Sequence, residues 1–559
     1  MSWMAMWIGS CGPCRVWATG FLSGVCIVYL FGVLLLPPGF TQSPPSTFQI
    51  PAPAVADPDG AASTKELTPP VQEKIERPNK NVRITEARIT HLFNAWSALL
   101  NTTTSDDALK RPDVPRPPHL ENCRLDVEKN RKFDRRGDDG AFPPWTLWKG
   151  SLGLELFNPT LHAKKGAANP DGLQYPPWIA GSDEDNYPQT RRVQRDIWVH
   201  QHPPDCSDPN LRFLVADWER LPRLGIGAQI VAMSGLLSIA MKEKRILIMG
   251  YYNRADHDGC KGASRSSWSC YFFPETSPDC HKRAFELVQN NASLANGTVR
   301  VKNSYDSRKM WVAGVPRLWG EPWKHMQPTT EVNGTLMRHH RRKDWRWWIA
   351  QATRYLMRFR TEYTCGLLNS ARHSAFGMQA AKLVLESIQN DSPKAGIART
   401  DSDDIERLVW SYHRPYLPRP LLSVHVRMGD KACEMAVVGF DKYMELAGRL
   451  RRRFPSLKNI WLSTEMQEVI DGTGHYPGWS FYFTRAARQS GNQSMAAYEG
   501  SLGREASTNN ALVNFMMATE ADFFVGALGS TWCYIIDGMR NTGGKVMAGF
   551  LSVNKDRFW

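Results

Sequence analysis

The stretch 421–435, LLSVHVRMGDKACEM, constrains the fold more than any other part of the chain. It begins as a β-branched apolar run and passes directly into a charged turn, as a buried strand of a parallel sheet does where it meets its loop. In open α/β sheets, ligands bind beyond the carboxyl ends of such strands. The polar side chains at this end are His425, Arg427, Asp430, Lys431 and Glu434. Arginine and lysine together favour a diphosphate ligand, because a guanidinium grips phosphate oxygens as a planar fork and lysine adds a point charge. The alternative is a surface loop with solvated charges.

The chain after this stretch alternates helix-like and strand-like segments. In chain order, we expect a helix at 440–454, strands at 459–465 and 479–483, a helix at 509–521 and a strand at 522–528. Such alternation indicates βαβ units and a parallel sheet. The turn Gly529, Ser530 and Thr531 then opens a helix, so backbone donors and two hydroxyls lie where a phosphate could bind. Helix capping is the alternative role of these hydroxyls.

A strand, helix and strand unit precedes this part. Strands are expected at 211–217 and 245–250, joined by a helix that ends near Lys242. A glycine-rich turn opens that helix, and its residues are Gly225, Ile226, Gly227 and Ala228. Such a turn at a helix start exposes backbone N–H groups to an anion. Close packing of the helix on a strand is the alternative use of the glycines.

Four stretches, in order, resemble the GDP-fucose fucosyltransferase superfamily and point to its α1,6-fucosyltransferase branch. HVRMGDK followed by Glu434 is similar to the HxRxxD(K) signature, and the other stretches are 223–249, 344–360 and 520–540. The resemblance implies an α/β, GT-B-like fold in which a Rossmann-type donor-binding subdomain (405–559) packs on a preceding α/β subdomain (196–404). It also implies an inverting glycosyltransferase that moves fucose from GDP-fucose to a hydroxyl of a glycan.

The resemblance implies roles for individual residues. Arg427, supported by Lys431, would neutralise the departing diphosphate, and Glu434 is the expected base for the acceptor proton. His425 would contact the nucleotide, whereas Asp430 would orient the loop. Further donor contacts are expected from Gly225, Ile226, Gly227, Ala228, Asn514, Ser530 and Thr531. Because cations serve the phosphates and no DxD carboxylate cluster stands at a strand end, we expect no metal cofactor.

Three positions depart from the family pattern. Met428 stands where the family carries a second arginine, Glu434 arrives one residue early, and Asn514 replaces an aspartate that reads guanine. Two rival hypotheses therefore stay open. One is a transferase with another donor or with a protein hydroxyl as its acceptor. The other is a non-catalytic lumenal glycan-binding protein on a degenerate transferase fold.

The N-terminal part predicts attachment to a membrane. Residues 18–36 are uncharged and just long enough to cross a bilayer as a helix. We interpret them as a signal anchor after a short cytosolic tail (1–17), with a cleaved signal peptide as the alternative. The Pro- and Ser-rich segment 37–83 is typical of an extended stem, and 84–195 of a helix-containing, loop-rich packing region. Together these segments predict a single-pass type II Golgi membrane protein with a lumenal catalytic body.

Sequons and cysteines agree with a lumenal body. Potential N-glycosylation sites are Asn101, Asn291, Asn296, Asn333, Asn390 and Asn492. Eight cysteines follow the apolar segment, an even number compatible with disulfides. The resemblance implies a bridge from Cys206 to one of three downstream cysteines, which are Cys260, Cys270 and Cys280. It also places a partner of Cys533 at the position that Gly526 occupies, so Cys533 should be free or differently paired.

Three further patterns bear on packing and partners. The apolar stripe of a helix expected at 84–100 either packs on the catalytic body or forms a homodimer contact. The tryptophan-rich helix in 344–360 fits core packing better than a sugar platform, because aromatic stripes at helical spacing are usually core. The net charge of +14 accompanies no recognisable nucleic-acid module. We therefore expect no nucleic-acid partner, and an anionic nucleotide sugar or membrane face instead.

Overall fold

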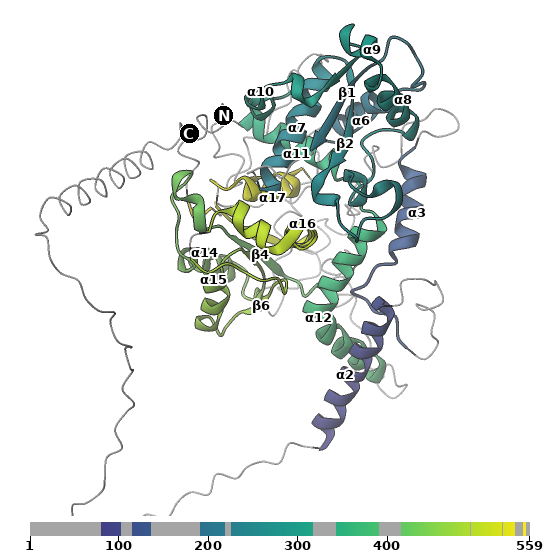
Figure 1. The fold of residues 1–559 in the computed structure, drawn as a ribbon. Helices are drawn as coiled ribbons and strands as arrows, with labels where there is room; N and C mark the ends of the chain where they lie inside the picture. The colour runs from purple at the N-terminus through teal and green to yellow at the C-terminus, as the bar shows by residue number, and fades with distance from the viewer. Residues whose placement is uncertain are drawn as a thin grey trace, which may run out of the picture. The chain divides into compact units, whose positions relative to one another are not determined.

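The first sheet lies near the middle of the chain in the computed structural model (Figure 1). The structure describes residues 80–101, 114–135, 190–218, 225–316, 343–390, 415–491, 493–527, 529–542 and 552–554.

The strands of the first sheet are β1 (Arg212–Trp218), β2 (Arg245–Tyr252) and β3 (Val299–Val301), all parallel, in the order β2-β1-β3. The strands expected at 211–217 and 245–250 are thus confirmed as β1 and β2.

Alternating side chains cover both faces of this sheet. Phe213 and Ile248 pack with helix α8 (Pro278–Val288), whereas Leu214 and Leu247 belong to the core that contains α7 (Ile226–Lys242). Helix α7 connects β1 to β2, which is the crossover that two parallel neighbours require. Burial on both faces explains why these strands are apolar runs rather than alternating ones.

The second sheet has four parallel strands in the order β6-β5-β4-β7. They are β4 (Leu421–Val426), β5 (Asn459–Thr464), β6 (Ser480–Tyr482) and β7 (Phe523–Val525). Val424 of β4 pairs with Leu462 of β5 on one side and with Val525 of β7 on the other. Every residue of β4 is buried, so the run that predicted a buried strand of a parallel sheet is one. The α/β class with parallel sheets is therefore confirmed.

Helices alternate with the strands of the second sheet. They are α14 (Phe440–Arg453), α15 (Gln467–Asp471), α16 (Met495–Glu520) and α17 (Thr531–Asn541), of which α17 follows the last strand. Helix α16 begins earlier than the helix expected at 509–521. Ser494 caps its start by accepting a hydrogen bond from Ala497 N, and Gly503 bends it at a φ of 77°. A positive φ costs glycine little, so the helix continues beyond a position where other residues would be strained.

Helix α11 (Lys343–Leu356) confirms the prediction of core packing for the tryptophan-rich segment. Trp348, Ala352, Tyr355 and Leu356 are buried along one stripe. The indole of Trp348 donates from Nε1 to the backbone carbonyl of Ser234 in α7, at 3.0 Å. The aromatic side chains therefore hold helices together and present no sugar-binding platform.

The helix expected at 84–100 is α2 (Lys80–Asn101). From Arg88 onward it belongs to a unit that runs to Trp559, while the unit ending at Ala87 contributes only its first turns to the described residues. Leu92 and Trp96 pack against Ala380 and Ala381 of α12 (Glu362–Asn390). The stripe therefore packs within the chain, as one of the two expectations had it. The homodimer contact stays a prediction.

The described residues form three disulfides. Cys123–Cys365 and Cys206–Cys280 join segments far apart in the sequence, whereas Cys260–Cys270 closes a short loop. The expected bridge from Cys206 is confirmed, with Cys280 at the start of α8 as its partner. Cys533 is free and buried, as the glycine at 526 predicted. Structural disulfides of this kind fit a secreted or lumenal protein.

The remaining helices are α3 (Cys123–Phe133), α6 (Thr190–Gln201), α9 (Asn291–Ala295) and α10 (Ser307–Val312). Within the described ranges, no helix combines the length and apolarity that a bilayer crossing requires. The tail and anchor predicted at 1–17 and 18–36, and nearly all of the stem at 37–83, lie outside the described residues.

Candidate functional site

Arg427 is the centre of a buried ion-pair cluster at the carboxyl end of β4. Its guanidinium contacts Glu465 through Nη1 and Asp430 Oδ1 through Nη2, the latter at 2.6 Å. Nη1 also donates to the carbonyl of Met428 at 2.7 Å. Burial disfavours the charged guanidinium, but the two carboxylates outweigh it and raise the pKa of Arg427 above its ordinary value. The side chain is therefore a fixed cation, oriented by two acids.

Glu465 is the member of this cluster that the sequence analysis did not single out. It follows β5 directly and is buried. Its carboxylate accepts from the backbone N–H of Met428 at 3.1 Å and also pairs with Arg427. A signal existed, because parallel neighbours end at the same sheet edge and Val426 pairs in register with Thr464. The residues that follow the two strands are therefore adjacent.

Asp430 connects the loop after β4 to helix α16. Its Oδ1 pairs with Arg427, while its Oδ2 accepts from the backbone N–H of Met495 at 2.9 Å. Burial favours the protonated carboxyl, but Arg427 and the Met495 N–H prevail, and the pKa of Asp430 falls below its ordinary value. These contacts hold the loop against the start of α16. Because its pKa is lowered, Asp430 is a carboxylate near neutral pH.

Lys431 and Glu434 lie on the tight turn Gly429–Cys433 and its end. The ammonium of Lys431 is 2.6 Å from Glu434 Oε1, and both side chains are partly exposed. The residue expected to bind phosphate and the residue expected to act as base are thus partners here.

His425 points from β4 toward β5. Its Nδ1 hydrogen-bonds with the hydroxyl of Ser463, and its Nε2 is buried without a partner among the described residues. Burial, assisted by the charge of Arg427, lowers the pKa of His425 to about 3. The imidazole is therefore neutral, and its Nε2 atom is a buried polar group that no described side chain satisfies.

The glycine-rich turn lies beside the helix starts of the second sheet. A Cβ on Gly227 would lie 3.1 Å from the ring of Trp532 and 3.6 Å from the Thr531 methyl. A Cβ on Gly225 would lie 3.4 Å from Met495 Cγ. The structure therefore brings together the starts of α7, α16 and α17. Close packing, the alternative considered for these glycines, is one of their roles.

Other atoms of these two turns are used within the chain. Ile226 is buried in the core, and the backbone N–H of Ala228 donates to the Gly225 carbonyl at 3.0 Å. Ser530 occupies the N-cap position of α17, but its side chain makes no capping hydrogen bond. Capping by the Ser530 hydroxyl is therefore not the reason for a serine here.

Asn514 lies on α16 with its amide engaged by neighbours. Its Oδ1 accepts from the Trp461 indole at 3.0 Å, and its Nδ2 donates to the Asn510 carbonyl at 2.9 Å and toward Thr484 Oγ1 at 3.3 Å. The side chain is buried. An aspartate here would keep the contact with Trp461 but could no longer donate to the Asn510 carbonyl. The guanine contact expected of Asn514 stays a prediction.

A cleft of about 710 Å³ lies between the loop after β2 and the bend in α16. Its lining includes Asp256 and His257 on one side and Arg504, Glu505 and Asn509 on the other. Arg504 Nη1 pairs with Asp256 Oδ2 across it at 2.5 Å. The lining combines charged side chains of both signs with apolar surface from residues such as Leu502 and Ala506. Such a surface suits a ligand rich in hydroxyl groups.

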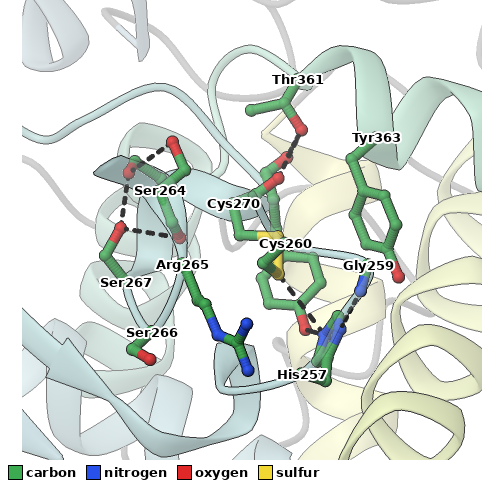
Figure 2. The surroundings of a disulfide bond; sticks show 12 residues. His257, Gly259, Cys260, Ser264, Arg265, Ser266, Ser267, Cys270, Thr361 and Tyr363 are labelled. Atoms are coloured by element: carbon green, nitrogen blue, oxygen red, sulfur yellow. Dashed lines mark hydrogen bonds between the residues drawn. A yellow bond between two sulfur atoms is a disulfide. The ribbon is translucent and has the colours of Figure 1, made fainter. Parts of the chain in front are cut away.

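The Cys260–Cys270 disulfide supports one wall of this cleft (Figure 2). His257 lies against Cys260, with its Nδ1 accepting from Gly259 N at 3.1 Å and its Nε2 2.6 Å from the Tyr271 hydroxyl. Because Tyr271 itself donates to the Arg254 carbonyl, His257 carries its proton on Nε2. Burial lowers the pKa of His257, so the ring is neutral. Nothing in the sequence marked this cleft.

Within the described residues, no group of three or more His, Cys, Asp and Glu side chains is arranged to hold a metal ion. Metal independence stays a prediction. No protein-family model matches the chain, and no curated protein matches it at a significant level.

Proposed function

We propose that this chain is an inverting, α1,6-fucosyltransferase-like glycosyltransferase that moves fucose from GDP-fucose to a hydroxyl of a glycan. The observation that carries the proposal is a buried, permanently charged Arg427 at the carboxyl end of the central strand β4, within the HVRMGDK stretch. Ligands of open parallel sheets bind at this edge. The family resemblance of that stretch supplies the donor and the reaction.

The chemistry follows from charge. The acceptor oxygen attacks the anomeric carbon of fucose while the bond from that carbon to the β-phosphate oxygen breaks. Glu434 takes the acceptor proton, and the phosphate takes the bonding electrons. Arg427 and Lys431 stabilise the negative charge that grows on the phosphate. Arg427 now pairs with Glu465 and Lys431 with Glu434, and a phosphate would compete with these carboxylates for the same donors.

The charged and amide side chains that line the cleft support a hydroxyl-rich acceptor. Helix α16 starts at Met495, whose backbone N–H donates to Asp430, and its residue Leu502 already lines the cleft. Seven residues of helix rise roughly 10 Å, so the cleft begins about that far from the loop. A glycan could therefore extend from the transfer point into the cleft. A GT-B-like arrangement, and a type II Golgi protein anchored through 18–36, complete the proposal.

One observation favours the non-catalytic rival. Two carboxylates already neutralise Arg427, which is what a purely structural ion pair would look like. A glycan-binding protein with a retained but silent nucleotide site would keep the cleft and lose the transfer.

The deciding experiment incubates the full-length protein with GDP-fucose and a mixed glycan library. We expect glycans heavier by one fucose in the mass spectrum, and GDP as the other product. Glycans retained by the protein without any mass increase would replace the proposed function by the rival. Transfer from a different nucleotide sugar in a parallel panel would leave a transferase but change its donor.

A further inference from the structure

Gln489 lies beside the ion-pair cluster, yet neither the family resemblance nor the proposed chemistry uses it. Its backbone N–H donates to the Glu465 carbonyl at 2.9 Å, and its carbonyl accepts from Gln467 N at 2.9 Å. These two bonds fix the segment alongside the end of β5, in parallel register with Met466. The side chain is 4% exposed. Its direction is therefore set by the fold.

The carboxamide of Gln489 converges with Arg427 and Glu465 over Gly429. A Cβ on Gly429 would lie 3.3 Å from Gln489 Nε2, 3.5 Å from Arg427 Nη1 and 3.5 Å from Glu465 Oε1. All three polar atoms thus surround one point. Gly429 has a φ of +57°, and the lack of a side chain there allows the three to approach its backbone. Gln489 is therefore part of the site that Arg427 defines.

Both polar atoms of this carboxamide lack a partner. Gln489 Nε2 and Oε1 are buried and have no hydrogen bond to any described residue. Gln201 shows how a buried glutamine of this chain is otherwise satisfied, since its amide donates to the Leu247 carbonyl and accepts from Leu247 N. Buried polar groups are nearly always paired. A glutamine with an unmatched donor and acceptor beside a binding arginine indicates a ligand group that supplies both.

The chemistry of that group can be narrowed. Phosphate oxygens only accept hydrogen bonds, so a phosphate would satisfy Nε2 and leave Oε1 unpaired. A hydroxyl both donates and accepts. We infer that Gln489 binds a hydroxyl of the sugar nucleotide next to the diphosphate on Arg427, forming a subsite that reads a sugar rather than a phosphate. This inference rests on the proposed function. The hydroxyl belongs either to the ribose or to the transferred sugar.

The test compares three ligands by isothermal titration: GDP, GDP-fucose and 2′,3′-dideoxy-GDP. The variant is Gln489→Met, which keeps the length of the side chain and removes both polar atoms. Gln467→Met is the matched control, because the Gln467 amide is already paired with Asp471 at the surface. The control should bind all three ligands as the wild type does.

A ribose contact predicts that Gln489→Met weakens GDP about tenfold and leaves dideoxy-GDP unchanged, since a lost hydrogen bond of ordinary strength is worth about that factor. A contact with the transferred sugar predicts a similar loss for GDP-fucose and none for GDP. Either pattern supports the inference and identifies the hydroxyl. Unchanged binding of all three ligands, or an equal loss for all three, would overturn it.

Thermal melting separates this role from a structural one. Without ligand, Gln489→Met should melt at the wild-type temperature or above, because an unmatched buried donor and acceptor are replaced by an apolar group. A melting temperature several degrees lower would mean that the amide holds the fold together through a structural water, and the inference would fail. A wild-type protein that binds neither GDP nor GDP-fucose would overturn the proposed function and this inference together. Wild-type binding that Gln489→Met leaves intact would overturn the inference alone.

Discussion

The two parallel sheets hold the loops at their carboxyl ends by different means. In the first sheet, Asp217 Oδ1 accepts from the backbone N–H of Tyr251 at 2.8 Å, and the Cys260–Cys270 disulfide closes the loop after β2. In the second sheet, the described residues form no disulfide, and the loop after β4 is held by the ion pairs of Arg427. One loop is therefore fixed covalently and the other by charge.

This difference separates a permanent framework from contacts that a ligand can replace. Phosphate and carboxylate oxygens compete for the same guanidinium fork. A diphosphate can take over contacts that Glu465 and Asp430 now make with Arg427, whereas no anion can replace a disulfide. The ion-paired sheet end is thus the one suited to binding and release.

The largest effect on stability should come from the covalent framework. Replacing Cys206 and Cys280 together by alanine removes a cross-link with a sequence separation of 74. This should lower the free energy of unfolding by about 4 kcal/mol, mainly because the unfolded chain gains freedom. Cys533→Ala, in the part without disulfides, should lower it by about 1 kcal/mol, since only a buried sulfur is lost. Urea unfolding followed by circular dichroism measures both, and equal losses would contradict the comparison.

The next effect concerns the charged sheet end. Arg427→Lys keeps a cation near Glu465 but loses the planar fork, so turnover should fall at least about a hundredfold, or about 3 kcal/mol of transition-state stabilisation. Arg451→Lys is the matched control, because this half-buried arginine of α14 lies over the Trp479 ring and donates to the Gly478 carbonyl, outside the Arg427 cluster. Initial rates of fucose transfer measure both. A rate for Arg427→Lys within threefold of the wild type would remove Arg427 from the mechanism.

Acid should weaken both sheets through two histidines whose pKa values are lowered by burial. Burial lowers the pKa of His425 to about 3 and that of His200, which donates to the Arg245 carbonyl, to about 4. Both values lie below the ordinary 6.5. Above pH 6.5 these histidines are unprotonated in both the folded and the unfolded chain. As the pH falls below it, the unfolded chain binds protons that the folded chain refuses, and stability is lost until the folded pKa is reached.

Each histidine should therefore remove up to about 1.4 kcal/mol of stability per pH unit within its window. His425→Gln and His200→Gln should each flatten the profile, and the effect of His425 should extend to lower pH. Chemical unfolding at half-unit steps between pH 7 and pH 4 measures this. A wild-type stability that does not fall between pH 6.5 and pH 4.5 would count against the neutral state of both rings.

The smallest effect is expected from metal removal. Turnover in excess EDTA should stay within about twofold of its value without chelator, because arginine and lysine serve the phosphate in the proposed mechanism. As a control, the free energy of unfolding of the variant that lacks Cys206 and Cys280 should be the same with and without EDTA. Complete inhibition by EDTA that Mn²⁺ reverses would refute metal independence.

The sequence predicted strands and helices well where burial leaves a clear pattern of apolar residues. The apolar run at 421–426 became a buried internal strand, because a run of that length before a charged turn has few alternatives. The Cys206 bridge was implied by the family resemblance, and the structure contains it. The partner of Arg427 was missed, since the contact with Glu465 depends on the register between β4 and β5, and packing of the intervening helix sets that register.

The contacts of Asn514 illustrate the same limit. Its position on a helix could be read from the sequence, but the orientation of its amide toward Trp461 depends on how α16 bends at Gly503 and packs on β5. The sequence gives no strong signal for the bend. A single glycine inside a helix costs about 1 kcal/mol relative to alanine, and many helices contain one without bending.

Titration of GDP into the wild-type protein and into Arg427→Lys, in EDTA, tests most directly whether the charged sheet end binds a diphosphate. We predict that the wild type binds GDP without metal and that Arg427→Lys binds it at least about tenfold more weakly, because the lysine replaces a forked contact by a single one. Equal affinity of the two proteins, or no GDP binding by the wild type, would contradict the central claim that Arg427 exchanges its carboxylates for a diphosphate.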